Sequence, residues 1–132
     1  MNSNIAVQKR ILVVDDEPSI RLLYVDVLLE HGYKIDTAAD GGSAWMAIQS
    51  TPYDLIITDN IMPRMSGVEL IKSIHDARLS LPLILVTGTL PGREIIQEPW
   101  FQRVVLLLKP ISIRQLLLAV TTALSPPRVH GV

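Results

Sequence analysis

The sequence predicts an α/β fold, a doubly wound five-stranded parallel sheet with the strand order 2-1-3-4-5. Five short apolar runs alternate with segments that carry helix signals, and this alternation is typical of parallel sheets. Most of the runs are rich in branched residues and apolar on both faces, as strands covered by helices on two sides are. Five such units in 132 residues match a common doubly wound topology.

Length and composition predict one compact domain. The chain has 132 residues, of which 48% are apolar and 19% charged, so it can bury a sizeable core. Hydrophobic periodicity runs from about residue 10 to residue 124 and is lost outside this range. We therefore expect a domain over residues 10–124, a flexible N-terminus over 1–9 and a flexible C-terminal tail over 125–132.

Charge and cysteine content exclude several classes of function. Lys and Arg number 12 against 13 Asp and Glu, so no basic surface for nucleic acid or anionic membrane is indicated. The absence of cysteine excludes disulfides, thiolate metal sites and cysteine nucleophiles. Even the longest apolar runs, such as Val104–Leu108, are far shorter than the ~20 residues that span a bilayer. Met1–Lys9 has no apolar signal-peptide core, so we expect a cytoplasmic protein.

The strands and the first helix are indicated by local patterns. The predicted strands are Arg10–Val14, Lys34–Ala38, Leu55–Thr58, Leu83–Thr87 and Val104–Leu108. Pro18 stands where a first helical turn tolerates proline, and apolar residues follow it at helical spacing. Gly32 ends this first helix.

The second, third and fifth helices have recognisable boundaries. A short second helix over Ala44–Ser50 is expected between Gly41-Gly42 and Thr51-Pro52. The patterns Ser-x-x-Glu from residue 66 and Ser-x-x-Gln from residue 112 are capping boxes, which predict helices over about 67–77 and 113–124.

The fourth helix is weakly indicated. Pro91, Gly92 and Pro99 leave room for little more than two turns between residues 91 and 101. We therefore expect a short or irregular helix there.

Polar residues follow four of the predicted strands. Asp15 and Asp16 come after strand one, Asp59 after strand three, Thr87 at the end of strand four and Lys109 after strand five. Ligands of doubly wound sheets bind beyond the carboxyl ends of the strands, at the switch point between strands one and three. The sequence therefore predicts that these side chains meet in one cleft.

Such a cleft favours Mg²⁺ and phosphoryl chemistry. Carboxylates ~4 Å apart repel by about 4 kcal/mol per pair at an effective dielectric near 20, so cations must offset them. Lys109 supplies one charge, and Mg²⁺ suits a site with few carboxylates and an incoming phosphate. Asp59 is the best candidate nucleophile, with Asp15 and Asp16 holding the ion and Thr87 bonding a phosphoryl oxygen.

The chain resembles the receiver domain of bacterial response regulators, which act in two-component signal transduction. The motifs match in order from about residue 10 to 124: Ile-Leu-Val-Val-Asp-Asp-Glu-Pro from residue 11, Asp-Leu-Ile-Ile-Thr-Asp from residue 54, Met-Pro-x-Met-x-Gly from residue 62, Val-Thr-Gly from residue 86, and Lys-Pro from residue 109. The resemblance implies the (βα)5 receiver fold, which is chemotaxis-regulator-like and flavodoxin-like.

The resemblance also implies residue roles at the acidic end of the site. Asp59 is expected to be the phosphoacceptor. Asp16 is expected to bind Mg²⁺ directly, Asp15 largely through water, and the backbone carbonyl of Ile61 to complete the ligand set together with Asp59.

Two further roles and the partners follow from the same resemblance. Thr87 is expected to be the switch hydroxyl and Lys109 the phosphate contact, with a cis bond between Lys109 and Pro110. The phosphoryl donor is expected to be a phosphohistidine on a sensor histidine kinase or a histidine phosphotransfer protein. The chain is then a signalling phosphoacceptor with intrinsic phosphotransfer and autodephosphorylation, not an enzyme with external substrates.

Two segments depart from the family pattern. Leu106 stands where the family usually has an aromatic switch residue, so the usual aromatic readout is in doubt. Pro99–Arg103 replaces a Gly-Ala-rich turn, and Trp100 and Phe101 within it either pack onto the core or form a rebuilt partner surface.

Ile61 and Thr89 occupy the family positions that flank the route of the water that removes the phosphoryl group. An apolar side chain cannot position that water. We therefore expect Ile61 to slow the loss of phosphate.

Other functions are disfavoured or left open. A flavodoxin-type carrier needs hydroxyls and glycines after strand one, and a haloacid-dehalogenase-like phosphatase needs Asp-x-Asp there; Asp15 and Asp16 fit neither. The serious alternative is a receiver-like protein-binding module that works without phosphorylation. The cognate kinase, the downstream target, a longer parent protein and a homodimer through residues such as Leu118 are left open by the sequence.

Overall fold

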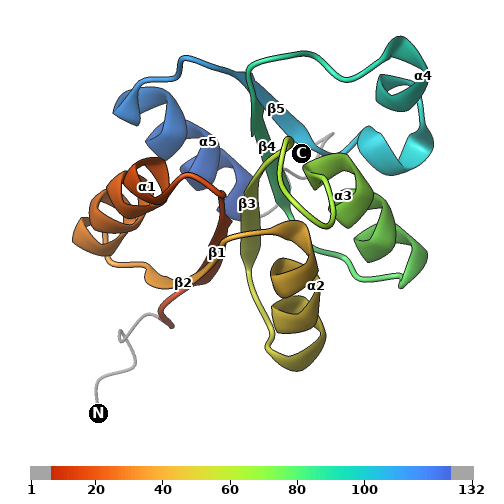
Figure 1. Ribbon diagram of the computed structural model, residues 1–132. Coiled ribbons are helices and arrows are strands. Elements are labelled where there is room, and N and C mark those ends of the chain that lie inside the picture. The colour runs from red at the N-terminus through yellow and green to blue at the C-terminus, as the bar shows by residue number, and fades with distance from the viewer. Residues whose placement is uncertain (1–6, 126–132) are drawn as a thin grey trace, which may run out of the picture.

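The structure is a computed structural model that describes residues 7–125. The flexible ends predicted over residues 1–9 and 125–132 lie for the most part outside the described residues, as the grey traces in Figure 1 mark. Within the described part of the chain, no helix has the length and apolar character needed to cross a membrane.

Five strands form one parallel sheet, and its order β2-β1-β3-β4-β5 confirms the predicted topology. The strands are β1 (Arg10–Val14), β2 (Lys34–Ala38), β3 (Leu55–Asp59), β4 (Leu83–Thr87) and β5 (Val105–Leu108). The register pairs Asp59 with Val86 and Thr87 with Leu108. The last residues of β3, β4 and β5 therefore lie side by side at the carboxyl edge of the sheet, where the parallel strands end.

Helices connect successive strands and cover both faces of the sheet. They are α1 (Pro18–Glu30), α2 (Gly41–Ser50), α3 (Gly67–Asp76), α4 (Arg93–Ile96), the 3₁₀ turn η1 (Pro99–Phe101) and α5 (Ile113–Leu124). In Figure 1, α1 and α5 lie on one side of the sheet and α2 and α3 on the other.

Alternate residues of each strand supply two separate cores. One core lies under α1 and α5 and contains Ile11, Val13, Leu55, Ile57, Ile84 and Val86 from the strands, with Tyr24, Leu28, Leu116, Ala119 and Val120 from the helices. The other lies under α2 and α3 and contains Leu12, Val14, Ile56, Leu83 and Leu85, with Ala44, Ile48, Leu70, Ile71, Ile74 and Phe101. Each face of the sheet is thus sealed by apolar side chains, and polar groups are left to its ends.

Helix α2 begins three residues before the predicted start at Ala44. The side chain of Asp40 accepts a hydrogen bond of 2.7 Å from the backbone N–H of Ser43, which caps the helix. The prediction was wrong because Gly41 and Gly42 were taken as a turn. A side chain at position 41 would overlap the backbone of Met65, so the glycine serves close packing inside the first helical turn.

The fourth connection is short, as predicted. It consists of the four-residue α4 and the three-residue η1. Phe101 is buried in the core, and Trp100 is half-buried and packs against it edge-on with ring centroids 6.1 Å apart. On α5, Ile113 is exposed and lies in the first turn, ahead of the buried Leu116.

A charged cluster ties the edge strand β2 to the sheet. Arg10 donates hydrogen bonds of 3.0 and 2.7 Å from Nε and Nη2 to Oδ2 of Asp36, and the Tyr53 hydroxyl donates one of 2.7 Å to the same oxygen. The guanidinium also lies 5.6 Å from the centroid of the Tyr53 ring. Burial and the bond to Asp36 raise the pKa of Tyr53 to about 12.

Replacing Asp36 with asparagine should lower the free energy of unfolding by about 1–2 kcal/mol near neutral pH. The carboxylate accepts charge-assisted bonds from two side chains, and its partial exposure limits their net contribution. Urea denaturation of Asp36→Asn and wild type measures the difference. Asp26→Asn, at an exposed position of α1, is the matched control and should change stability little.

The same variant should alter the acid dependence of stability. Burial opposes ionisation of Asp36, but the bonds from Tyr53 and Arg10 outweigh it and lower the pKa in the folded state. The stabilisation is therefore present above the unfolded pKa, near 4, and is lost as the pH falls through the folded pKa. Stability should fall less below about pH 4 in Asp36→Asn than in wild type, and parallel curves would contradict this account.

Candidate functional site

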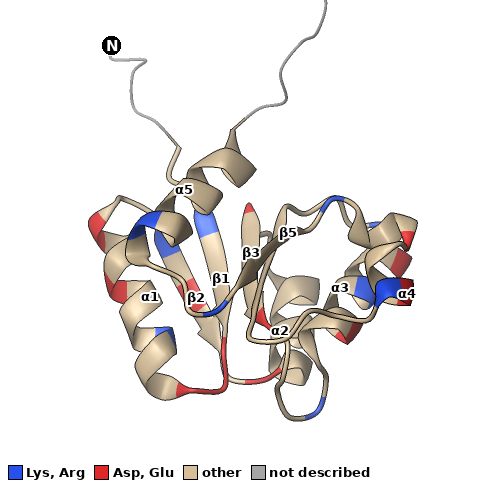
Figure 2. Ribbon diagram, turned by 90° about the horizontal axis from the view of Figure 1, so that it is seen from above, with Lys and Arg blue, Asp and Glu red and all other residues tan. Residues whose placement is uncertain are grey.

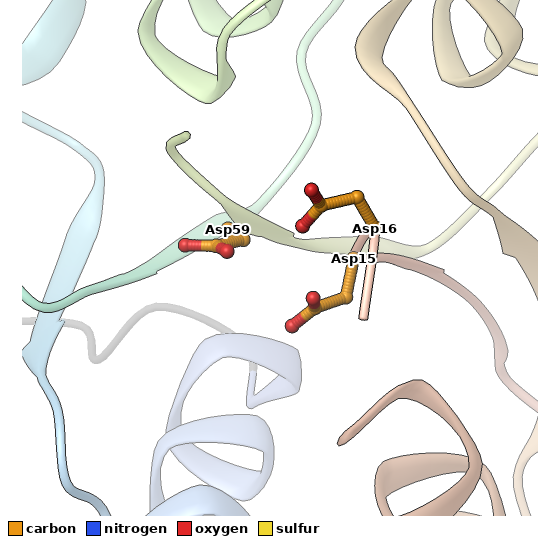
Figure 3. A group of neighbouring side chains, drawn as sticks. All are labelled: Asp15, Asp16 and Asp59. Atoms are coloured by element: carbon orange, nitrogen blue, oxygen red, sulfur yellow. The ribbon is translucent and has the colours of Figure 1, made fainter. Parts of the chain in front are cut away.

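Three carboxylates meet at the carboxyl edge of the sheet. Asp15 and Asp16 directly follow β1, and Asp59 is the last residue of β3. One carboxylate oxygen from each lies within 4.8 Å of the others. Figure 3 shows the three side chains converging from the two strand ends, and Figure 2 shows acidic residues in the loop that joins β1 to α1. The structure thus brings together the acidic residues that the sequence analysis selected.

The lysine that directly follows β5 completes the group. Lys109 Nζ lies 3.4 Å from Asp59 Oδ2, with 32% of the lysine side chain and 12% of the aspartate side chain exposed. The peptide bond between Lys109 and Pro110 is cis, as predicted. The Lys109 backbone N–H also donates a hydrogen bond of 2.9 Å to the carbonyl of Thr87, which fixes the lysine to the end of β4.

Asp15 is the buried member of the cluster. The residue is 2% exposed, and its Oδ1 accepts a hydrogen bond of 2.9 Å from the backbone N–H of Glu17. Burial raises the pKa of Asp15, the bond from Glu17 opposes this, and the charge of Asp59 adds to the rise. Arg21 donates a hydrogen bond of 2.6 Å to the Asp15 carbonyl, which pins the loop to α1.

The loop after β3 is anchored by a residue that the sequence analysis missed. The backbone N–H of Asn60 donates a hydrogen bond of 2.7 Å to Asp59 Oδ1. The Asn60 side-chain oxygen accepts one of 3.0 Å from the N–H of Val68, and its carbonyl accepts one of 2.8 Å from Gly67. Asn60 therefore couples the Asp59 carboxylate to the start of α3. An asparagine directly after a strand-end aspartate is the signal that could have identified it, because its amide favours such local bonds.

Thr87 is held by its own loop. The residue is 1% exposed, and its hydroxyl donates a hydrogen bond of 3.0 Å to the carbonyl of Thr89. The same oxygen accepts a bond of 3.3 Å from the Thr89 N–H. The predicted switch hydroxyl therefore already has partners in the loop after β4.

The two apolar positions singled out by the resemblance have different environments. Ile61 follows Asp59 by two residues, and it is 72% exposed to solvent. Leu106 is half-buried, packs against the core under α2 and α3, and pairs with Leu85 in the sheet. An aliphatic residue that is already packed inward lacks the large rotation available to an exposed aromatic ring.

The ligand atoms present fit a hard divalent cation. Asp15, Asp16 and Asp59 offer only oxygen donors, and the partial exposure of Asp16 and Asp59 leaves room for water ligands. Mg²⁺ prefers this combination of carboxylates and water. The three negative charges also exceed the single positive charge of Lys109, so a further cation would lower their repulsion.

A doubly wound sheet of order 2-1-3-4-5 with an acidic cluster and a lysine at its carboxyl edge defines a protein of the receiver class. The chain belongs to the response regulator receiver domain family, whose pattern matches residues 11–121. Members of this family are the signalling phosphoacceptors of two-component systems and interact with sensor kinases and downstream effectors. The resemblance stated from the motifs is thereby confirmed.

Relatives and solved structures agree with this assignment. The alkaline phosphatase synthesis transcriptional regulatory protein PhoP of Bacillus subtilis is 38% identical over 80 residues, which are 61% of this chain and 33% of the relative. The chain thus spans about a third of the length of the curated relatives that it first matches.

Two crystal structures show the same fold. A CheY-like receiver domain protein from Methanospirillum hungatei has a TM-score of 0.81 and 29% identity, with 89% of this chain and 94% of that chain covered. The response regulator protein TrrA from Thermotoga maritima, solved in complex with Mg²⁺ and BeF, has a TM-score of 0.75 and 35% identity, with 88% and 99% covered.

Gly67→Ala should displace the loop that carries the phosphoacceptor candidate. A Cβ at position 67 would overlap the backbone oxygen of Asp59 and crowd Leu85, whereas a Cβ at Gly88 would meet no atom within 4 Å. We expect Gly67→Ala to lose about 1–3 kcal/mol of stability and to shift the backbone amide resonances of Asp59 and Asn60.

Gly88→Ala is the matched control, because it adds the same methyl group near the same edge of the sheet. It should leave the Asp59 resonance and the unfolding free energy nearly unchanged. Equal effects of the two substitutions in NMR spectra and urea denaturation would contradict the packing argument.

Proposed function

We propose that the chain accepts a phosphoryl group from a phosphohistidine onto Asp59 and thereby changes its affinity for a protein partner. The observation that carries this proposal is the ion pair between Lys109 and Asp59 inside a group of three carboxylates. A lysine held 3.4 Å from one carboxylate is placed to contact the oxygens of a phosphoryl group attached there.

The transfer would exchange one bond to phosphorus for another. A carboxylate oxygen of Asp59 attacks the phosphorus, and the bond from phosphorus to the imidazole nitrogen of the donor breaks. The imidazole nitrogen keeps the electron pair of the broken bond. The ring is then neutral when one of its two nitrogens carries a proton, which it exchanges with water. Asn60 holds the other carboxylate oxygen with its backbone N–H, so the attacking group is oriented before the donor arrives.

Asp15, Asp16 and Asp59 are the side chains proposed to hold Mg²⁺, together with the backbone carbonyl of Ile61. When bound, Mg²⁺ neutralises charge on the oxygens of the transferred group. The complex of TrrA with Mg²⁺ and BeF supports this assignment by similarity. Within the pair, the exposed Asp16 is proposed to bind the ion directly, and the buried Asp15 largely through water.

Thr87 is proposed to transmit the phosphorylated state. To bond a phosphoryl oxygen, its hydroxyl must give up the bond to the Thr89 carbonyl. This exchange would free the loop after β4, where Leu90 is exposed and available to a partner. Leu106 is the family's switch position, but its inward packing favours a signal carried by the loop over one carried by a rotating ring.

A receiver-like binding module that works without phosphorylation is the second candidate. The aliphatic Leu106 and the short α4 favour it, because both alter the region through which the family usually signals. The two candidates differ in one respect, whether phosphorylation of Asp59 changes partner binding. A sensor histidine kinase or a histidine phosphotransfer protein in the cytoplasm remains the proposed donor for the first.

Incubation with acetyl phosphate and Mg²⁺ should add one phosphoryl group to the wild-type chain and none to Asp59→Asn. The substitution removes the nucleophilic oxygen while keeping the size of the side chain. Intact-mass spectrometry measures the gain, and an excess of a Mg²⁺ chelator should abolish it. A phosphoryl group on Asp59→Asn would assign the acceptor to another residue. None on wild type, with acetyl phosphate and with a panel of kinases, would favour the binding module.

Ile61→Asn should speed the loss of the phosphoryl group. The exposed isoleucine cannot hydrogen-bond the water that attacks phosphorus, whereas an amide can, and a positioned polar group contributes up to roughly 10²-fold. The rate is followed by intact mass after the phosphoryl donor is removed. Leu90→Asn is the control, since it makes a similar change at another exposed apolar residue. Equal or slower loss from Ile61→Asn would refute the expectation.

A further inference from the structure

A large groove lies at the edge of the sheet opposite the carboxylate cluster. It has a volume of about 970 Å³ and runs between the end of α3, the loop into β4 and the turn η1. Leu83, which begins β4, lines it, whereas Thr87 at the other end of the same strand belongs to the candidate phosphorylation site. Four residue steps along a strand separate the two edges by about 13 Å.

The floor of the groove is apolar and buried. Ile71, Ile74 and Leu83 line it and are at most 8% exposed. Trp100 forms part of the wall, half-buried and fixed edge-on against the core residue Phe101. An anchored tryptophan beside a preformed apolar surface is the kind of residue that carries binding energy in protein interfaces.

The rim of the groove is cationic. Arg78 and Arg103 both line it and are exposed, and no hydrogen bond or ion pair of either guanidinium occurs within residues 7–125. Asp76 also lines the groove, but its carboxylate pairs with Lys72 at 3.2 Å. The rim therefore presents two arginines that form no ion pair within the described part of the chain.

This distribution of groups favours a peptide over a small molecule. Small-molecule sites hold a few polar groups inside an apolar cavity, where they fix the ligand's orientation. Here the deep residues are aliphatic, and within the described chain no buried side-chain N or O atom lacks a partner. An apolar centre with a charged, exposed rim is instead the arrangement of a protein–protein interface.

We propose that this groove is a second docking site, which binds an acidic peptide segment of a partner protein. Apolar side chains of the segment would pack on Ile74, Leu83 and Trp100, and its carboxylates would pair with Arg78 and Arg103. Charge complementarity sets the sign of the partner's charge, and the groove lies at the opposite ends of the strands from Asp59. The site thus goes beyond the proposed phosphoacceptor function and does not depend on it.

The test is a titration of the ¹⁵N-labelled full chain, without Mg²⁺ or phosphoryl donor. The probe is an eight-residue peptide of alternating glutamate and leucine, acetylated and amidated to remove its terminal charges. The chain has 2 tryptophans, so two indole N–H resonances are expected, and Trp100→Phe assigns them. The probe should shift the Trp100 resonance and leave that of Trp45 in place, and the shift should weaken from about 0.05 M to about 0.5 M salt.

Matched variants separate the groove from general charge. Arg78→Asn with Arg103→Gln should weaken binding roughly tenfold, since each exposed ion pair contributes up to about 1 kcal/mol. Asparagine is chosen because Arg78 has a φ of +59°, which asparagine tolerates. Arg93→Gln with Arg114→Gln removes two exposed charges outside the groove and should bind as wild type does. Thermal unfolding of each variant confirms that it is folded.

Any of the following results would overturn the proposal. The first is a Trp100 resonance that the acidic peptide does not shift. The second is equal binding of a lysine–leucine peptide of the same length, or equal weakening by the two arginine pairs. The third is a shift produced by anionic phosphatidylglycerol vesicles or by a single-stranded oligonucleotide but not by the peptide, which would assign the groove to another class of polyanion. None of these results bears on phosphorylation of Asp59.

Discussion

Parallel strand order is the constraint on which the candidate site depends. Because all five strands point the same way, the residues that follow β1, β3, β4 and β5 reach one edge of the sheet from distant parts of the sequence. The apolar interiors of the strands are sealed by helices on both faces, so the free backbone ends and the polar side chains gather at that edge. The site is thus a consequence of the topology, and its chemistry comes from the residues placed there.

The carboxylates among those residues repel one another. They belong to Asp15, Asp16 and Asp59, and the fold restrains Asp15 and Asp59 with fixed donors. The backbone N–H groups of Glu17 and Asn60 donate to Asp15 and Asp59, and Lys109 forms an ion pair with the other oxygen of Asp59. A site that is restrained but still carries excess negative charge is prepared for a cation and for a phosphoryl group, which is why both enter the proposed function together.

The sequence predicted most of the strands and the site because their signals are strong and local. Buried strands need continuous apolar runs, and the proposed phosphoryl chemistry needs Asp, Thr and Lys at the strand ends. The start of α2 was missed because its cap, Asp40, precedes two glycines, and the role of the first, Gly41, is close packing against Met65, which is a tertiary contact. Asn60 was missed for the same reason: its importance lies in bonds to α3. The groove beside Trp100 depends on how three segments pack, which periodicity does not contain.

Leu106 and the segment with Phe101 depart from the family pattern, and both lie on one side of the sheet. They bear on how a change at Asp59 is transmitted to the protein surface. Leu106 and Phe101 both pack into the core under α2 and α3, so this region is a continuous apolar layer from β5 to η1. A layer of this kind resists the rotation of single side chains, because their space is already filled. The loop after β4 is not packed in this way, since Gly88, Thr89 and Leu90 are exposed. Movement confined to this loop would leave the groove at the opposite edge unchanged, so one receiver could hold one partner constantly and exchange another on phosphorylation.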